Sequence, residues 1–296
     1  MQGVPTGLFV GLSVLDVIQL VDFLPGANEK VVALDFMTAA GGPATNAAVA
    51  FAGLGGRAVL VTRMGDDPVG QLVVTELADC DVEVLSAGGC ESTAIASIMI
   101  TAGTGERAVV SASDRGRSRV AGGSDFGVGL VDRLKPDVVL VDSYEVDISL
   151  PIAREARAVG VPVLLDCGVK KEWTPNQLSC VDVAAVPSVY VLGGPQAIAD
   201  DLRSDGIHFG AITDGADPIW WWADGASVTS ELKVRSVAVV DTLGAGDFFH
   251  GALAYALAQD GLSGPSFEQA LSFAATIAAM SVQSFGSRLW LERLTV

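Results

Sequence analysis

Basic residues are scarce in this sequence. Its 18 Lys and Arg stand against 35 Asp and Glu, which gives a formal net charge of −17. Proteins that bind nucleic acid generally need clusters of Lys and Arg to contact the phosphate backbone. We therefore expect no nucleic-acid partner, and an anionic substrate would need a locally positive pocket within a negative field.

Long hydrophobic runs are absent as well. Hydrophobic residues make up 50% of the chain, but no apolar stretch continues for about 18 residues without a polar break, so we expect no membrane-spanning helix. The first residues, MQGVPTGLFVGLSVLD, have no basic segment ahead of the apolar ones, which argues against a secretory signal peptide. The four cysteines show no CxxC spacing, which argues against a zinc site. We expect a soluble cytoplasmic protein with reduced thiols.

Short apolar segments alternate with longer, alanine-rich ones along most of the chain. RAVLVTRMG is followed by GQLVVTELADC, and PDVVLVDS is followed by LPIAREARAVG. This alternation is typical of βαβ units and predicts an α/β fold of three layers (α/β/α), with a mostly parallel sheet between helices. Two of the predicted strands end in Asp142 and Asp166. Carboxyl ends of parallel strands usually open onto a binding site.

Two segments interrupt the alternation. Residues 17–38 and 93–110 each look like a pair of strands joined by a Gly or Pro turn, the second as a hairpin around TAGTGER. We predict that they form a small antiparallel β-sheet, a lid that covers a substrate or pairs with a second subunit, and we expect a homodimer through it. The core domain is then predicted to contain residues 1–16, 39–92 and 111–296.

A glycine-rich turn joins a predicted strand and helix in VAVVDTLGAGDFFHGALAYALA, residues 237–258. Gly244 and Gly246 allow the backbone to turn tightly and approach a ligand. The helix start offers unpaired N–H groups, which suit a phosphate. Asp247 is a candidate N-cap, or it accepts a proton from a substrate hydroxyl while the amides stabilise a transferred phosphoryl group. The nucleotide-binding pattern GxxxxGK[ST] is absent, and no GxGxxG follows the first strand.

Three motifs, in this order, resemble those of the ribokinase-like (PfkB) carbohydrate kinases: GGPATNAAVAFAGLG, MGDDPVG and DTLGAGD. The chain is identified as a member of that family on this resemblance. The resemblance implies ATP and Mg²⁺ as cofactors and a sugar as substrate. It also implies that Asp247 is the general base and that the amides of Gly244, Ala245 and Gly246 form an anion hole.

The resemblance also suggests binding residues. For the sugar they are Asp16, Gly41, Gly42, Asn46 and Lys30, with Asp16 placed at the end of the first strand. For ATP they are Thr213, Gly215, Gly246, Ala278 and Ser281, with the adenine between VAVV and a helix near the C-terminus.

Metal sites are less completely specified. Asp241 matches an aspartate that often helps to hold a monovalent cation in the family, so potassium dependence is a hypothesis. Two positions depart from the family pattern. Pro218 replaces the last glycine of T-x-G-x-x-G, and no glutamate of the magnesium-organising N-x-x-E element is found near DVAAVPS. The sequence therefore leaves the magnesium ligand unidentified.

We expect an ATP-dependent kinase acting on a hydroxyl, preferably primary, of a ketose or related sugar. The segments GGPATNAAVA and LPGANEKVVALDF look closest to the ketose and sulfofructose kinase branch, in which a lysine matches Lys30. Tyr144, however, stands in place of an arginine of the sulfofructose kinases, and a lid asparagine is replaced near Ser111. Arg107, Arg115 and Arg117 are alternative cations for an anionic group.

Three alternatives remain open: a kinase of sulfofructose or another anionic sugar, a nucleoside kinase, and a catalytically silent sugar- or nucleotide-binding regulator. The sequence does not identify the sugar, the hydroxyl or the order of lid closure.

Overall fold

The computed structural model describes residues 3–112, 126–224, 226 and 229–294, and the structural statements below concern these residues. The strands are β1 (Thr6–Val10), β2 (Val14–Val21), β3 (Asp35–Gly41), β4 (Arg57–Thr62), β5 (Val82–Ser86), β6 (Ile95–Thr101), β7 (Arg107–Ser111), β8 (Val138–Asp142), β9 (Val163–Asp166), β10 (Val183–Pro187), β11 (Phe209–Thr213), β12 (Ile219–Trp222) and β13 (Ser230–Leu232). The helices are α1 (Pro43–Gly53), α2 (Pro68–Asp79), α3 (Leu130–Leu134), α4 (Val146–Ala158), α5 (Thr174–Leu178), α6 (Gly194–Ser204), α7 (Ala245–Asp260) and α8 (Gly264–Ser281), with a 3₁₀ helix at Leu289–Arg293.

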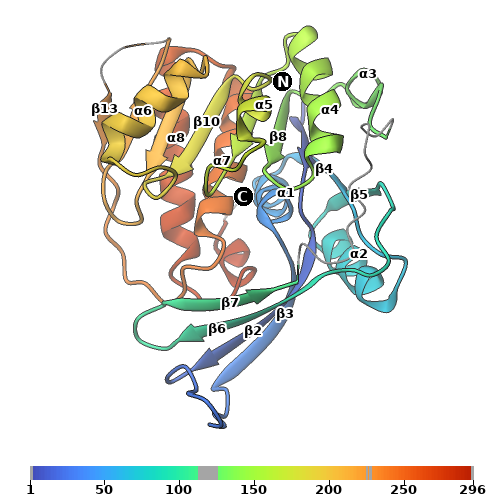
Figure 1. The fold of residues 1–296 in the computed structure, drawn as a ribbon, viewed down its shortest axis with the longest axis vertical. Helices are drawn as coiled ribbons and strands as arrows, with labels where there is room; N and C mark the ends of the chain where they lie inside the picture. The colour runs from blue at the N-terminus through green and yellow to red at the C-terminus, as the bar shows by residue number, and fades with distance from the viewer. Residues whose placement is uncertain (1–2, 113–125, 225, 227–228, 295–296) are drawn as a thin grey trace.

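The larger of the two sheets has the strand order β13-β12-β11-β10-β9-β8-β1-β4-β5. Its strands pair in parallel except at one edge, where β12 is antiparallel to both β11 and β13 (Figure 1). The pleat sends successive side chains to opposite faces: Leu8 and Val10 of β1 belong to one apolar core and Phe9 to the other. Helices α1, α2, α7 and α8 cover the face of Phe9, and α3 to α6 cover the opposite face. The predicted three-layer α/β/α architecture is confirmed.

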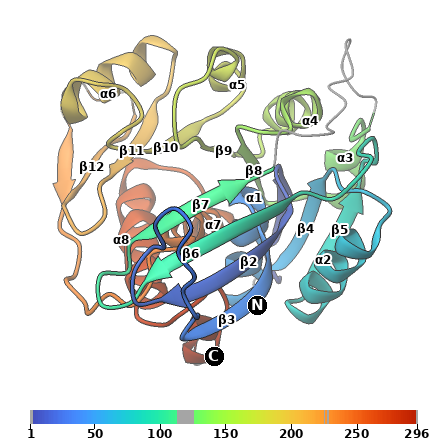
Figure 2. The ribbon, with the colours of Figure 1, turned by 60° about the horizontal axis from the view of Figure 1, so that its bottom comes forward.

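The smaller sheet has the order β3-β2-β6-β7 and projects from the core as the predicted lid (Figures 1 and 2). The two hairpins, β2–β3 and β6–β7, are antiparallel as expected. The central pair, β2 and β6, is parallel, so the lid sheet is mixed rather than antiparallel throughout. The reason is the path of the chain, which returns to the core through α1 to β5 and then enters the lid a second time from the same side.

Three local predictions need correction or cannot be placed. Asp16 lies within lid strand β2, because the apolar run breaks at Gly11–Ser13 between two strands. Residues 237–240 form no strand. Instead, the amides of Val240 and Asp241 donate to the carbonyl of Val282 at the end of α8. Arg115 and Arg117, two of the alternative cations for an anionic group, lie outside the described residues.

The MGDDPVG motif fixes the base of the lid. Asp67 caps α2, since its Oδ1 accepts a hydrogen bond from the amide of Gly70 at 2.7 Å. Its Oδ2 accepts one from the amide of Thr93 at 2.7 Å, just before β6. This carboxylate therefore joins α2 of the core to the second lid segment. Within the described part of the chain, none of the helices combines the length and the apolar character needed to cross a membrane.

Candidate active site

The predicted anion hole lies at the N-terminus of α7, which packs against β1, β8 and β9. Gly244 precedes the helix with a φ of 74°, a left-handed conformation that favours glycine. A Cβ atom at this position would lie 2.9 Å from the ring of Phe248. No side chain caps this helix within the described residues. The amide of Ala245 makes a long contact of 3.4 Å with the carbonyl of Thr242. The N-terminus of the helix can still attract an anion through its amides and the helix dipole.

Asp247 is the third residue of α7 and does not act as its N-cap. Its Oδ2 accepts a hydrogen bond from Nδ2 of Asn46 at 2.8 Å. Burial and the negative charge of Asp166 raise the pKa of Asp247 to about 7, while the Asn46 hydrogen bond and the positive charges of His250 and Arg107 oppose the rise. A carboxylate that exchanges its proton near neutral pH is well suited to general base catalysis.

The residues predicted to bind the sugar lie around the start of α1. Asp16 in β2 pairs with Ala39 in β3, and its carboxylate lies against Gly41, where an added Cβ would be 1.9 Å from Oδ2. Gly42 caps α1 with a φ of 109°. Burial and the negative charge of Asp247 raise the pKa of Asp16 to about 7, and the positive charge of Arg288 opposes the rise. The structure thus brings Asp16, Gly41, Gly42 and Asn46 to the same place as Asp247.

Arg288, which the sequence analysis missed, supports this group from the C-terminal segment. Its Nε donates to Oε1 of Glu76 at 2.6 Å and its Nη2 to the carbonyl of Ala40 at 2.6 Å. Its Nη1 lies 3.3 Å from Oδ1 of Asn46. Because Asn46 Oδ1 is thereby occupied as an acceptor, its Nδ2 is directed to Asp247. A single arginine far along the chain gives no local signal of such a role.

A cleft of about 430 Å³ opens beside the N-terminus of α7. Among the residues that line it are the predicted ATP positions Thr213, Gly215, Gly246 and Ala278. Val237 and Val239, predicted to contact adenine, line it too, although they belong to no strand. Ser281 is not part of the lining; it is buried and its hydroxyl donates to the carbonyl of Ala278. The cleft has the shape and apolar lining that suit a purine base.

Arg107 of lid strand β7 also lines the cleft. Its Nη1 lies 3.1 Å from Oγ1 of Thr242 and 3.3 Å from the carbonyl of the same residue. The Thr242 hydroxyl in turn donates to the carbonyl of Gly105 at 3.0 Å. The second lid hairpin is therefore fastened to the turn that leads into α7, and its arginine places a positive charge beside the anion hole.

Asp241 begins the turn that leads to the anion hole and is buried. Its two carboxylate oxygens accept hydrogen bonds from the amides of Leu243 and Gly286, each at 2.8 Å. Burial raises the pKa of this carboxyl. The described residues contain no group of three or more His, Cys, Asp or Glu side chains that could hold a metal ion.

Lys30 is the one predicted sugar-binding residue that is not brought to this group. It is exposed in the loop that joins β2 to β3 at the free end of the lid (Figure 1). Asp16 lies near the other end of β2, and Leu20, four positions further along the strand towards this loop, is about 13 Å away at the usual rise.

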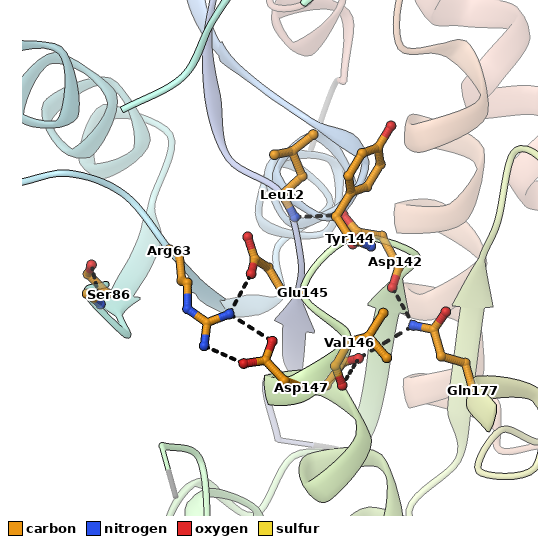
Figure 3. Close-up of polar contacts among 11 residues, drawn as sticks. Leu12, Arg63, Ser86, Asp142, Tyr144, Glu145, Val146, Asp147 and Gln177 are labelled. Atoms are coloured by element: carbon orange, nitrogen blue, oxygen red, sulfur yellow. Dashed lines mark hydrogen bonds and ion pairs between the residues drawn. The ribbon is translucent and has the colours of Figure 1, made fainter. Parts of the chain in front are cut away.

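A buried ion-pair network centred on Arg63 lies close to the turn that joins β1 to β2 (Figure 3). Arg63 at the end of β4 is 5% exposed and contacts Glu145 at 2.9 Å and Asp147 at 2.6 Å. Next to it, the Asp142 carboxylate accepts hydrogen bonds from the amides of Leu12 and Tyr144. The charge of Arg63 is therefore neutralised within the protein and is not directed to a ligand.

Tyr144 packs against the apolar core of the lid, in a group that includes Leu12 and Leu243. The ammonium group of Lys171, in the loop after β9, lies 3.9 Å from the centre of the Tyr144 ring and 5.5 Å from that of Trp173. Such cation–π contacts hold a lysine in place without neutralising its charge. Lys171 has no carboxylate partner within the part of the chain that the structure describes.

Comparisons with known proteins give one consistent result. The model of a family described as pfkB family carbohydrate kinase matches residues 7–115 and 196–293. The ribokinase of Arabidopsis thaliana is 26% identical over 308 residues, which covers 96% of this chain and 77% of that protein. A crystal structure from Agrobacterium tumefaciens that carries a provisional ribokinase assignment superimposes with a TM-score of 0.86 at 27% identity, covering 98% of this chain and 94% of that one. The structure of the Arabidopsis ribokinase complexed with ribose and ATP gives a TM-score of 0.75 at 22% identity, with both chains covered completely.

Proposed function

Because the chain belongs to the pfkB family of carbohydrate kinases, we propose that it transfers the γ-phosphoryl group of ATP to a primary hydroxyl of a neutral sugar, either a ketose or a pentose such as ribose. The observation that carries the proposal is the meeting of Asp247 and Asn46, 2.8 Å apart, at the uncapped N-terminus of α7. The segments GGPATNAAVA and LPGANEKVVALDF favour a ketose as the substrate, whereas the relatives described above are ribokinases.

In this proposal, Asp16 and Asn46 hold hydroxyl groups of the sugar and Asp247 accepts the proton of the attacking hydroxyl. The oxygen then attacks the γ-phosphorus while the bond to the β-phosphate oxygen breaks, which releases ADP. The amides of Gly244, Ala245 and Gly246 offset the charge that develops on the phosphoryl oxygens. Phosphoryl transfer depends mainly on alignment and charge neutralisation, and the rigid support of Asp247 by Asn46 supplies the alignment.

Magnesium enters this scheme as part of the substrate. Since no metal-binding cluster of His, Cys, Asp or Glu is present in the described residues, we infer that the ion reaches the site bound to the phosphate oxygens of ATP. The segment DVAAVPS, near which the family's N-x-x-E element was expected, contains no glutamate. No step is therefore assigned to a metal held by that element.

Asp241 is proposed to take part in a potassium site. Its carboxylate has two amide donors and, within the described residues, no cationic side chain in contact. Those donors hold the carboxylate in place, and its remaining lone pairs can accept a monovalent cation. The cation would then stabilise the turn between Asp241 and Gly244.

An anionic sugar is the second candidate substrate class. The observation that favours an anionic sugar is the position of Lys171. Its ammonium group lies over the ring of Tyr144 beneath the lid and has no carboxylate partner in the described chain. Arg63, the other cation in this region, is already neutralised by Glu145 and Asp147. One lysine is a weaker receptor than a bidentate arginine for a fixed anion, and for this reason the neutral sugar is preferred.

The first experiment measures ADP release from MgATP with a panel of ribose, ketoses, sugar phosphates, sulfofructose, ketodeoxygluconate and nucleosides, each in potassium and in choline salts. We expect the highest kcat/KM with one neutral sugar, and a lower rate in choline. If an anionic sugar were best, Lys171→Gln should raise its KM and leave that of neutral sugars unchanged. Ligand binding without ADP formation across the panel would contradict the proposal and favour a regulator, and a preference for a nucleoside would favour a nucleoside kinase.

A homodimer formed through the lid is also proposed. Lid strands β3, β6 and β7 expose large apolar side chains, including Phe36 (71%) and Val110 (71%). Such patches on soluble proteins often mark interfaces. We expect light scattering to give the mass of a dimer at micromolar concentration, and Phe36→Glu or Val110→Glu to reduce it to that of a monomer. A monomeric mass for the unmodified protein would rule the dimer out.

A further inference from the structure

His250 lies one turn after Asp247 on α7 and is 5% exposed. Its Nδ1 is 2.7 Å from the carbonyl oxygen of Gly246, and its Nε2 is 3.0 Å from the carbonyl oxygen of Ala185 in β10. Nδ1 is also 3.3 Å from Oδ2 of Asp166 at the end of β9. Both ring nitrogens therefore face oxygen atoms, and the two carbonyl oxygens can only accept hydrogen bonds.

A neutral imidazole cannot satisfy these contacts. It has one N–H group and one nitrogen lone pair, so in either tautomer a lone pair would point at a carbonyl oxygen 2.7 or 3.0 Å away. Only the imidazolium has two N–H groups to donate. A proton on Asp166 would not remove the conflict, because the carbonyl of Gly246 would still face Nδ1.

Asp166 is the acidic group placed to act as the counter-charge of this imidazolium. It is buried, and its Oδ2 has no hydrogen bond within the described residues. Asp142, its neighbour across the β8–β9 pairing, contributes a second negative charge. Burial raises the pKa of the Asp166 carboxyl, and the charge of His250 opposes that rise. Burying a carboxylate is costly unless it is paired, and the ring of His250 is in contact with this one at 3.3 Å.

We propose that His250 is a positioning residue held as an imidazolium, which pairs with Asp166, fastens the first turn of α7 to β9 and β10, and keeps Asp247 ionised. The effect on Asp247 rests on the proposed kinase function, whereas the protonation state does not. The charged groups that face His250 are Asp166 from β9 and Asp247 on its own helix, and β10 contributes only a carbonyl. The imidazolium thus stands between two carboxylates that would otherwise repel each other.

Loss of this charge would leave Asp166 and Asp247 without the cation between them. Two neighbouring buried carboxylates cannot both ionise easily, so the pair would retain a proton to higher pH. The base would then be protonated at neutral pH. A rise of one unit in its pKa would lower kcat/KM about tenfold at pH values well below the original pKa.

Nitrogen NMR of the unmodified protein, labelled with ¹⁵N-histidine, tests the protonation state directly. The chain has two histidines, and the exposed His208 serves as an internal control. Near pH 7 we expect both nitrogens of His250 to show the chemical shifts of protonated nitrogens. A shift typical of an unprotonated nitrogen at His250 near pH 7 would overturn the proposal, whether or not the protein is an active kinase.

A variant pair tests the effect on the base. His250→Asn removes the charge, and we expect the acidic limb of its kcat/KM profile to move to higher pH, with activity recovering in alkaline buffer. Adding Asp166→Asn removes the unpaired negative charge and should return the limb toward its original pH. A uniform loss of activity at every pH, with no displacement of the limb, would show a structural role only and contradict the proposal for Asp247.

Discussion

Replacing Asp247 with asparagine is expected to lower kcat by about 10²- to 10⁴-fold, the usual contribution of a general base. The amide cannot accept the proton of the attacking hydroxyl, but it keeps nearly the same shape and still offers an oxygen to Nδ2 of Asn46. The KM values for both substrates should therefore change little. Steady-state ADP release with the sugar found in the panel measures the effect.

The matched control for this variant is Asp260→Asn, at the exposed C-terminal end of the same helix. It makes the same chemical change on α7 away from the proposed chemistry, and we expect it to keep the original kcat. If Asp247→Asn retained a rate close to that of Asp260→Asn, Asp247 would not be the base. Circular dichroism should show the same fold for both variants.

The raised pKa of Asp247 adds a pH dependence to the same prediction. A base must be unprotonated to act, and the pKa of this carboxyl lies at about 7. The kcat/KM of the unmodified protein should therefore fall as the pH drops below about 7 and level off above it. An acidic limb near the ordinary aspartate range would contradict the environment described for this carboxylate.

Arg63→Met is expected to lower the free energy of unfolding by about 3–5 kcal/mol, the typical cost of removing one partner from a buried ion pair. Arg63 and Glu145 are 5% and 3% exposed, and Asp147 is 22% exposed. Methionine fills a similar volume but removes the cation in contact with the buried Glu145 carboxylate. Urea denaturation followed by fluorescence measures the change.

Arg57→Met is the control, because Arg57 pairs with Glu83 at the surface and both side chains are 49% exposed. Exposed ion pairs contribute about 0.2–1 kcal/mol, so this variant should differ little from the unmodified protein. Equal urea midpoints for the two methionine variants would contradict the importance assigned to burial. The Arg63 hydrogen bond also lowers the pKa of Asp147, so the stabilisation from this pair should be lost as the pH falls through that lowered pKa.

Much of the candidate site could be predicted from the sequence because its residues lie in two short motifs. The turn from Asp241 to Asp247 and the segment from Gly41 to Asn46 each contain their own glycines, helix start and polar side chain within a few residues. The backbone that positions such residues is formed locally, and the structure brings the two segments together through the Asn46–Asp247 hydrogen bond. For the same reason, four of the five positions predicted to bind ATP lie together at the wall of one cleft.

The sequence by itself determined the layered α/β core, the two lid segments and the candidate base, because each is encoded by periodicity or by a short motif. The tertiary structure alone decided which distant groups surround that base. Arg288 reaches Asn46, Arg107 reaches Thr242 from the lid, and His250 reaches Asp166 in β9. These partners are separated along the chain by 84 to 242 residues, and their contacts depend on strand order and helix packing, which no local pattern records. The parallel pairing of β2 with β6 has the same origin, since it follows from where the chain re-enters the lid.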